Sequence, residues 1–300
     1  MDYYGRLRSE ALERGIPAAQ VSKFADHLRF AIGVGAGSDW DGDVVGQRGG
    51  RPRLPAGMEW PLNGEYPLPF IASLDCAALP RIDKLPLPVD GSLLFFVDHE
   101  GAFESMFSGY DDDYVRFLYV PAGTETAVTP QPSGRDIPAA DPERPLFAKV
   151  EPQLPNWLEH EEDDDFDPLE RESDMVKQLA RELTHAEELI ALVDQLWPTR
   201  IRGEELSLGG YAWDIGGNDP PEMQMAQDRL GVRLKTGPDV PPADRGRWLE
   251  EEEFRIRQEW VPLVQCDTNS EFYYGRYFIS FDDLAACRFD KVRSVPGFTE

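Results

Sequence analysis

Closely spaced prolines limit the first half of this chain to short strands. Prolines stand at positions 52, 55, 61, 67, 69, 80, 86 and 88, and proline cannot donate to the ladder of a central strand. Short apolar runs at residues 70–72, 93–97 and 114–120 are bounded by Pro, Gly and Asp, which is the pattern of strands and turns. We therefore expect short, mainly antiparallel strands joined by extended, irregular connections.

Apolar residues at helical spacing predict helices in two regions. The first, at residues 3–32, is divided by Gly15 and Pro17 and is expected to end in the glycine-rich segment 33–38. The second, at residues 171–197, has large apolar residues three and four positions apart. This spacing predicts one long central helix that ends before a proline.

The rest of the chain predicts surface segments and further strands. Residues 122–167 are rich in Pro, Asp and Glu, and we expect them to wrap the surface. After a short helix near residues 222–230 and a charged stretch, strands are predicted at Trp260–Cys266 and Arg276–Ser280.

The fold class that these elements predict is α+β. One domain spans residues 1–300, with strand-rich lobes at 41–150 and 198–300 that are expected to pack together. N-terminal helices, the long central helix and an acidic loop at 151–170 complete the expected architecture. The order of elements excludes a repeated βαβ design.

The two strand-rich regions resemble each other weakly. When Asp75 is aligned with Asp267, Ser73 stands opposite Gln265, and a glycine then opens an aromatic strand in both copies. Either the chain contains an internal duplication that gives two related lobes, or the alignment is due to chance.

Composition and charge exclude several classes of function. With 56 acidic and 30 basic side chains, the formal net charge is -26, which repels phosphate backbones and anionic lipids. We therefore expect no direct nucleic-acid binding and no membrane association, and the N-terminus has no apolar signal segment. The three cysteines form no CxxC pair and are interpreted as reduced thiols, with a disulfide or a nucleophile as the alternative. The prediction is a cytoplasmic protein whose oligomeric state the sequence leaves open.

Negative charge is concentrated in residues 151–170, which hold nine carboxylates and neither Lys nor Arg. One interpretation is a solvated, mobile loop, because like charges at this density resist packing. Another is a docking surface for a basic protein partner. Calcium binding is a third, but the segment lacks the ligand spacing and turn glycine of an EF-hand. The candidate docking residues are Glu161, Glu162, Asp163, Asp164 and Asp165.

Motifs of known catalytic chemistry do not occur in the sequence. It contains no HExxH, no G-x-S-x-G and no phosphate-binding loop, and its four histidines are scattered. Because no ligands are clustered, we expect no metal and no cofactor. An enzyme is therefore the less favoured class, and no residue is identified as catalytic.

Two small groups of residues remain as ligand-binding candidates. Asp75 and Asp267 would end equivalent strands and, with Gln265, could face each other across a cleft between the lobes, as acid and base or as metal ligands. The alternative is that each aspartate caps a turn after its strand. Tyr211 and Trp213 follow two glycines and either offer a flat apolar surface to a ring or sugar or pack the loop in place.

Short motifs follow one another in a fixed order through both halves of the chain, and many of their members are glycine, proline and aromatic residues, which commonly serve turns and packing. The first half contributes Gly49, Gly50, Pro52, Leu54, Pro55, Trp60, Pro61, Asp75, Leu85, Pro86, Asp90, Gly91, Phe95 and Phe96, and the second half contributes Trp260, Leu263, Gln265, Asp267, Gly275, Tyr277, Phe278, Ile279, Asp283 and Leu284. In this order they resemble the bacterial YwqG-like family, which has no established biochemical function. The resemblance covers most of the chain.

Three departures from that family pattern bear on function. Ser73 replaces the usual Gln, Ala212 the usual Pro, and Tyr274 the usual acidic residue. If those polar residues formed a shared active site, this copy has lost part of it. If they were structural, neighbouring polar groups or water can substitute for them.

The sequence favours a non-catalytic protein-interaction or binding module with an acidic surface. One form of it is an immunity-like inhibitor of a basic toxin or nuclease, in which carboxylates imitate a phosphate backbone. The alternative is an enzyme or small-ligand receptor with a carboxylate-containing site between the two lobes.

Overall fold

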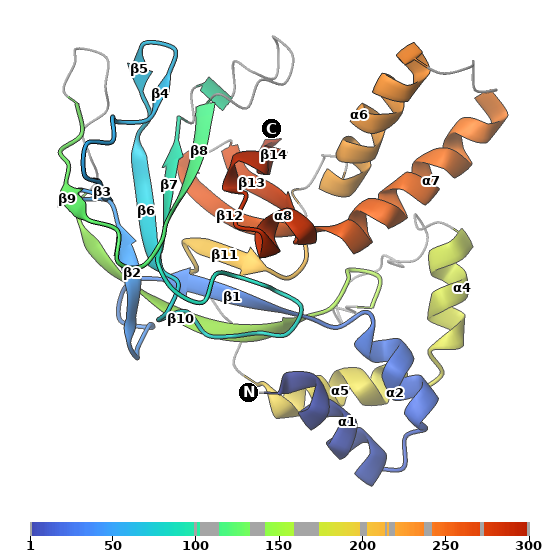
Figure 1. Cartoon of the computed structure of the whole chain (residues 1–300). Coiled ribbons are helices and arrows are strands. Elements are labelled where there is room, and N and C mark those ends of the chain that lie inside the picture. The colour runs from blue at the N-terminus through green and yellow to red at the C-terminus, as the bar shows by residue number, and fades with distance from the viewer. Residues whose placement is uncertain are drawn as a thin grey trace.

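The computed structural model describes residues 2–98, 101–102, 114–132, 142–158, 174–198, 203–213, 215, 220–236, 242–270 and 273–298. In these residues a curved sheet occupies one side of the molecule, and helices lie below it and to its right (Figure 1). None of the described helices combines the length and the apolar character that crossing a membrane requires.

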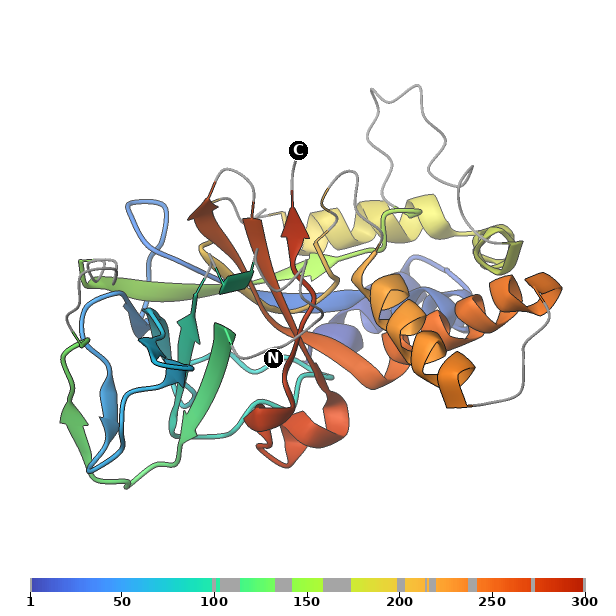
Figure 2. The same ribbon diagram turned by 90° about the horizontal axis from the view of Figure 1, so that it is seen from above.

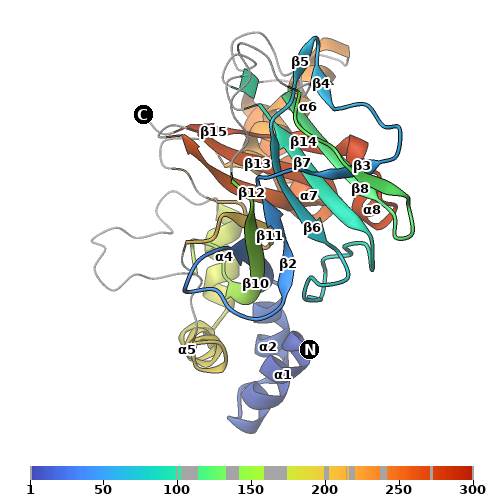
Figure 3. The ribbon, with the colours of Figure 1, turned by 90° about the vertical axis from the view of Figure 1, so that its left-hand side faces the viewer.

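Eleven strands form one antiparallel sheet. Their bounds are β1 Arg29–Gly35, β2 Val44–Arg48, β6 Phe70–Asp75, β7 Ser92–Val97, β8 Val115–Val120, β10 Arg144–Gln153, β11 Leu206–Gly209, β12 Trp260–Ser270, β13 Tyr273–Ser280, β14 Arg293–Ser294 and β15 Gly297–Phe298. The hydrogen-bonded order is β14-β13-β12-β11-β1-β10-β2-β6-β7-β8, and β15 pairs with β13. The sheet curls until it is nearly closed as a barrel (Figure 3).

The two edges of this sheet meet through side chains. Phe117 of β8 packs edge-on against Tyr277 of β13 with ring centroids 5.1 Å apart, and the Tyr114 hydroxyl donates to Ser294 Oγ of β14. Phe117 and Tyr277 are buried in the main core cluster together with inward-facing residues of the other strands. The interior of the curled sheet is therefore packed rather than open.

Two short strand pairs cover part of the outer face of β6, β7 and β8. They are β3 (Arg53–Pro55) with β9 (Thr126–Val128), and β4 (Leu62–Asn63) with β5 (Tyr66–Pro67). Trp60 is buried under this cover, and its Nε1 donates to the carbonyl oxygen of Leu68 at 2.9 Å. The apolar cluster beneath the cover consists of Leu54, Trp60, Leu68, Phe70, Leu94, Phe96 and Val120.

Two groups of helices pack against the sheet. Their bounds, with the two short helices after β13, are α1 Tyr3–Glu13, α2 Ala18–Ala25, α4 Asp174–Glu182, α5 Ala186–Leu196, α6 Pro221–Thr236, α7 Pro242–Glu259, α8 Phe281–Ala285 and the 3-10 helix η2 Phe289–Lys291. α1, α2 and α5 pack on one another, and their buried Leu7, Phe24 and Leu189 join the main core. α6 and α7 form a hairpin that projects away from the sheet (Figure 2).

The structure confirms a mixed arrangement of helices with an antiparallel sheet. Strands lie where the sequence predicted them at residues 70–72, 93–97 and 114–120, and in both C-terminal segments. Strands from residues 41–150 and from 198–300 belong to one continuous sheet. The strand order is symmetric about the β1–β10 pair, with β2, β6, β7 and β8 on one side and β11, β12, β13 and β14 on the other.

The predicted helical region 3–32 is wrong at its C-terminal end. α2 ends at Ala25, and residues 29–35 form β1, a central strand with β10 and β11 as neighbours. Residues 30–35 are all buried, and such a continuous apolar run is typical of a strand covered on both faces. Gly35 lets the Trp40 ring pack directly on the strand, so this glycine belongs to β1 rather than to a helix exit.

The single long central helix predicted at 171–197 is also wrong. α4 ends at Glu182 and α5 begins at Ala186. Thr184 and His185 favour helix weakly, and a break at these residues still leaves Leu183 buried in the main core. Apolar spacing alone did not reveal this break, because the apolar residues continue on both sides of it.

One strand and one helix lie in polar segments where the sequence predicted neither. Residues 122–167 were expected to wrap the surface, but β10 at 144–153 is a central strand between β1 and β2. The predicted acidic loop therefore overlaps β10 at its start, and residues 159–170 lie outside the described part of the chain. The charged stretch before β12 is the helix α7, in which Ile256 is fully buried.

Candidate functional site

The end of β6 opens onto a groove of about 420 Å3 on the outer face of the sheet. Its polar lining comes from Gln47, Ser73, Asp75, Ser92 and Glu143. Ser73 and Asp75 face it because the residues that alternate with them in β6 belong to the core. We call this feature the β6 groove.

Local backbone geometry shapes the β6 groove. A Cβ atom at Gly46 of β2 would overlap the Ser73 carbonyl oxygen, so glycine permits the close approach of β2 to β6. Asp75 is exposed, and its Oδ1 accepts the N–H of Ala77 at 2.9 Å. The carboxylate of Asp75 thus ends the strand in an Asx turn and also lines the groove.

The structure does not bring Asp75 and Gln265 together. β6 and β12 are separated in the sheet by β11, β1, β10 and β2, and adjacent strands lie about 4.8 Å apart. Asp267 pairs through its backbone with Tyr274, and its side chain lies outside the described part of the structure. Of the two aspartates, only Asp75 can therefore be placed at a described site.

Gln265 does lie beside Tyr211 and Trp213. Its side chain is fully buried, its Oε1 accepts the N–H of Trp213 at 2.6 Å, and its Nε2 donates to the carbonyl oxygen of Tyr211 at 2.9 Å. Both polar atoms of this amide are therefore engaged by the loop that follows β11. In this position Gln265 holds the loop against the sheet.

A second set of contacts holds Tyr211 from the other side. Gln153 Oε1 accepts the N–H of Tyr211 at 2.8 Å, and the Tyr211 hydroxyl donates to the carbonyl oxygen of His27 at 2.7 Å. The guanidinium of Arg29 lies 4.4 Å from the centre of the Tyr211 ring. Gly210 has a positive φ of 70°, and a Cβ there would overlap the Gln153 amide, so the loop needs glycine at this point.

Arg276 fixes the other end of the same loop. It is almost fully buried and donates to three backbone carbonyls, those of Val295 at 2.9 Å, Trp213 at 3.2 Å and Pro296 at 3.1 Å. These contacts tie β13 to the loop and to the C-terminal segment. Tyr211 and Trp213 remain half-buried, so part of each ring is still at the surface.

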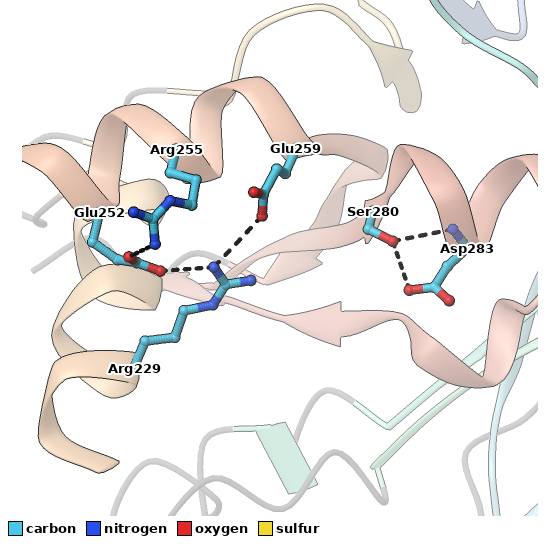
Figure 4. A network of polar contacts seen from close by, with 6 residues as sticks. All are labelled: Arg229, Glu252, Arg255, Glu259, Ser280 and Asp283. Carbon is cyan, nitrogen blue, oxygen red and sulfur yellow. Dashed lines mark hydrogen bonds and ion pairs between the residues drawn. The ribbon is translucent and has the colours of Figure 1, made fainter. Parts of the chain in front are cut away.

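Figure 4 shows two polar networks, one between α6 and α7 and one at the start of α8. Glu252 is 3% exposed, and its two oxygens accept from Arg229 at 2.8 Å and Arg255 at 2.7 Å. At the start of α8, Ser280 Oγ accepts the N–H of Asp283 and donates to its carboxylate at 2.6 Å. Hydrogen bonds from Ser280 and from Arg288 hold the pKa of Asp283 below its usual value.

The motif glycines and the tryptophan of the first half occupy positions of tight packing. Gly49 and Gly50 both have positive φ and follow the last residue of β2. Gly91 also has a positive φ, and a Cβ there would overlap the backbone of Val120 on β8. These contacts explain the residue types without a ligand. The other motif residues also make structural contacts. Pro52 and Trp60 are buried, Pro55 lies in β3, and Gly275 lies beside the Tyr277 ring. Asp90 accepts a hydrogen bond from the Tyr119 hydroxyl.

Among the described residues, no three His, Cys, Asp or Glu side chains are grouped as a metal site would need. The three cysteines are free thiols, and burial raises the pKa of Cys76 to about 11, so this thiol is protonated at neutral pH. The docking candidates Glu161 to Asp165 lie outside the described residues. Their role stays a prediction.

Sequence reasoning missed the residues that complete the β6 groove and the loop contacts. Gln47 stands just before Arg48-Gly49-Gly50, but no strand was predicted there, so its pairing with Ser73 was not foreseen. Glu143 lies in a Pro-rich and acidic segment that gave no strand signal. Residues 44–48 do not alternate between apolar and polar side chains, so the sequence holds no signal that places Gln47 on the same face as Ser73.

Comparison with known proteins identifies a family. Residues 47–295 match the family described as Domain of unknown function (DUF1963). The match covers most of the chain and includes both halves of the sheet, so the protein belongs to this family. No curated protein matches the chain.

Proposed function

We propose that the protein is a non-catalytic binding module and that the β6 groove receives a positively charged group of its partner. The observation that carries this proposal is the lining of the groove. Two carboxylates, Asp75 and Glu143, line the same concave space of about 420 Å3 as two hydroxyls and one amide. Oxygen-rich linings of this kind suit the ammonium of lysine or the guanidinium of arginine.

The charge of the whole chain supports a basic partner. A net charge of -26 creates a field that attracts cations, and a groove lined by carboxylates strengthens that field locally. The acidic residues Glu161 to Asp165 would add a second docking surface. Association should be fast at low salt and weaken as salt screens the charges.

A structural role for the other ligand candidates supports a non-catalytic reading. Gln265 uses both polar atoms of its amide to hold the loop, and Tyr211 is held by its hydroxyl, its N–H and its ring. The described groove holds hydroxyls and carboxylates but no histidine, cysteine or lysine. Among the described contacts the hydroxyls of Ser73 and Ser92 make no hydrogen bond to Asp75 or Glu143, so a nucleophile paired with a base is not assembled from this lining.

A small-ligand receptor is the second candidate. The volume of the β6 groove lies in the range of small-molecule sites. An amine such as a polyamine would satisfy the same carboxylates as a lysine side chain.

We propose further that the protein acts in the cytoplasm, that it belongs among the YwqG-like proteins, and that its symmetric strand order reflects an internal duplication.

A charge-matched comparison tests the leading function. The immobilised wild-type chain, the Asp75→Asn/Glu143→Gln variant and a Glu13→Gln/Glu250→Gln control are each exposed to lysate of the cells that make the protein, at low and at high salt. Glu13 and Glu250 are exposed on α1 and α7, so the control removes the same charge away from the groove. We expect a basic protein that is retained at low salt by the wild-type chain and the control and lost with the groove variant.

Three outcomes separate the alternatives. Equal loss in both variants would mean that bulk charge, and not the groove, holds the partner. Binding of spermidine to the wild-type chain but not to the groove variant, with no protein retained, would favour the small-ligand receptor. Retention of the same proteins by all three forms would contradict the proposed groove.

A further inference from the structure

Arg48 is a buried cation whose hydrogen-bonding groups are not all satisfied. It ends β2, and its side chain is 4% exposed. Its cross-strand partner on β6 is Ala72, a core residue. Within the described part of the chain, its Nε and Nη1 have no hydrogen-bond acceptor in suitable geometry. A buried guanidinium in this state is costly, and its retention calls for a physical explanation.

A second arginine lies directly opposite. Arg144 of β10 is the cross-strand partner of Arg48. Both approach the same oxygen of Glu205, with Arg48 Nε at 3.1 Å and Arg144 Nη2 at 3.2 Å from Oε2. Two guanidinium groups thus share one carboxylate. Like charges opposite each other in a sheet repel, so this pairing is unfavourable without a further negative charge.

The position of the cluster allows such a charge to arrive from solvent. Glu205 immediately precedes β11, Arg48 ends β2 and Arg144 begins β10, so all three lie at the same end of these strands. The side chain of Arg144 is 47% exposed, whereas that of Glu205 is 18% exposed. An anion can therefore meet Arg144 first and then the buried head of Arg48.

We propose that Arg48 and Arg144 form a binding site for a small oxyanion, a phosphate or a carboxylate group. A guanidinium presents a planar fork of N–H donors that matches two oxygens of such a group. The three side chains sum to one positive charge, which a monoanion would neutralise. The small exposed fraction of Arg48 restricts the ligand to a compact group.

This site is independent of the proposed function. Gln47 faces the β6 groove, whereas the next residue, Arg48, faces the barrel side of the sheet. The groove would take cations and the arginine pair would take anions. Failure of either site leaves the other untouched.

Thermal unfolding with inorganic phosphate tests the arginine pair. The full chain is titrated with phosphate at constant ionic strength, with chloride as the reference, and the apparent Kd follows from the rise in Tm. We expect the Tm of the wild-type chain to rise with the logarithm of phosphate concentration above the Kd. We expect no rise for Arg48→Met, which removes the charge and keeps an apolar side chain of similar length. Arg53→Gln removes an exposed arginine in contact with Thr126 and should leave the phosphate effect unchanged.

Two further variants keep the test decisive. If Arg48→Met does not fold, Arg144→Gln, at a half-exposed position, should weaken phosphate binding at least about tenfold. Glu205→Gln removes the competing carboxylate and should tighten phosphate binding, whereas a purely structural ion pair predicts destabilisation with no phosphate dependence. Equal effects of phosphate and chloride, or an unchanged phosphate effect in Arg144→Gln, would overturn the proposal.

Discussion

Replacing Gln265 with leucine separates a structural amide from a ligand-binding one. Leucine has nearly the same volume and keeps the apolar packing of a fully buried position. It removes both hydrogen bonds to the loop, the one accepted from Trp213 N–H and the one donated to the Tyr211 carbonyl oxygen. The loop keeps its contacts to Gln153 and Arg276, so the change acts on one of its anchors only.

The expected cost can be worked out from these two bonds. Each buried hydrogen bond contributes about 1 kcal/mol, and a buried group left without a partner costs about 1–3 kcal/mol. Because Tyr211 and Trp213 are half-buried, water can reach part of the released loop and reduce the second term. The free energy of unfolding should therefore fall by about 2–4 kcal/mol.

Urea unfolding followed by far-UV circular dichroism measures this change. Gln258→Leu, at an exposed position of α7, is the matched control and should change the free energy of unfolding by less than about 0.5 kcal/mol. A similarly small change in Gln265→Leu would refute the structural assignment. Gln265 would then return as a ligand-binding residue, to be tested for a loss of binding with intact folding.

Three other perturbations follow from particular contacts. Phe96 is fully buried between the rings of Trp60 and Phe70, so Phe96→Ala should lower the free energy of unfolding by about 3–5 kcal/mol in urea. Ser280→Ala removes the side-chain cap of α8 and should lower the free energy of unfolding by about 1 kcal/mol at neutral pH. The difference from the wild-type chain should shrink in acid, because the lowered pKa of Asp283 stabilises the folded chain above the ordinary pKa of aspartate, and this stabilisation is lost as the pH falls through the pKa in the folded state. Burial lowers the pKa of His27, so the unfolded chain takes up a proton more readily and stability should fall as the pH drops below about 6.5. His27→Gln should reduce that slope between neutral and mildly acid pH, and an unchanged slope would contradict it.

Local sequence patterns were sufficient for the strands that stand between proline and glycine. Phe70, Leu93 and Phe117 lie in short apolar runs with sharp boundaries, and each run is a strand of the sheet. Local patterns were not sufficient where pairing with distant strands decides the structure. The glycines of β1 suggested the end of a helix, but this segment is a strand because β10 and β11 pair with its two sides.

The site residues divide in the same way. Asp75 could be placed at a strand end from the sequence, but its neighbours Gln47 and Glu143 come from β2 and from the segment before β10. Arg276 gave no signal, because an arginine in an aromatic strand does not show whether its guanidinium meets solvent or three backbone carbonyls. Such placements depend on contacts between residues far apart in sequence, which periodicity does not encode.

The short side chain of Ser73 accounts for the open space of the β6 groove. β6 and β12 hold matching places on either side of the β1–β10 pair, and the alignment of Asp75 with Asp267 sets Ser73 against Gln265. On β12 the long amide reaches the loop after Gly209-Gly210 and is fully buried. On β6 the short hydroxyl lines an open groove instead.

Placing glutamine at position 73 should therefore close the groove. In Ser73→Gln the new amide would lie opposite Gln47, its cross-strand partner, and would occupy space between Asp75 and Glu143. Because the side chain points away from the core, the free energy of unfolding should change by less than about 1 kcal/mol. Retention of the basic partner, or of spermidine, should be lost, whereas Ser22→Gln at an exposed position of α2 should leave it intact. Undiminished binding in a folded Ser73→Gln variant would mean that the space beside Ser73 is not where the cation enters.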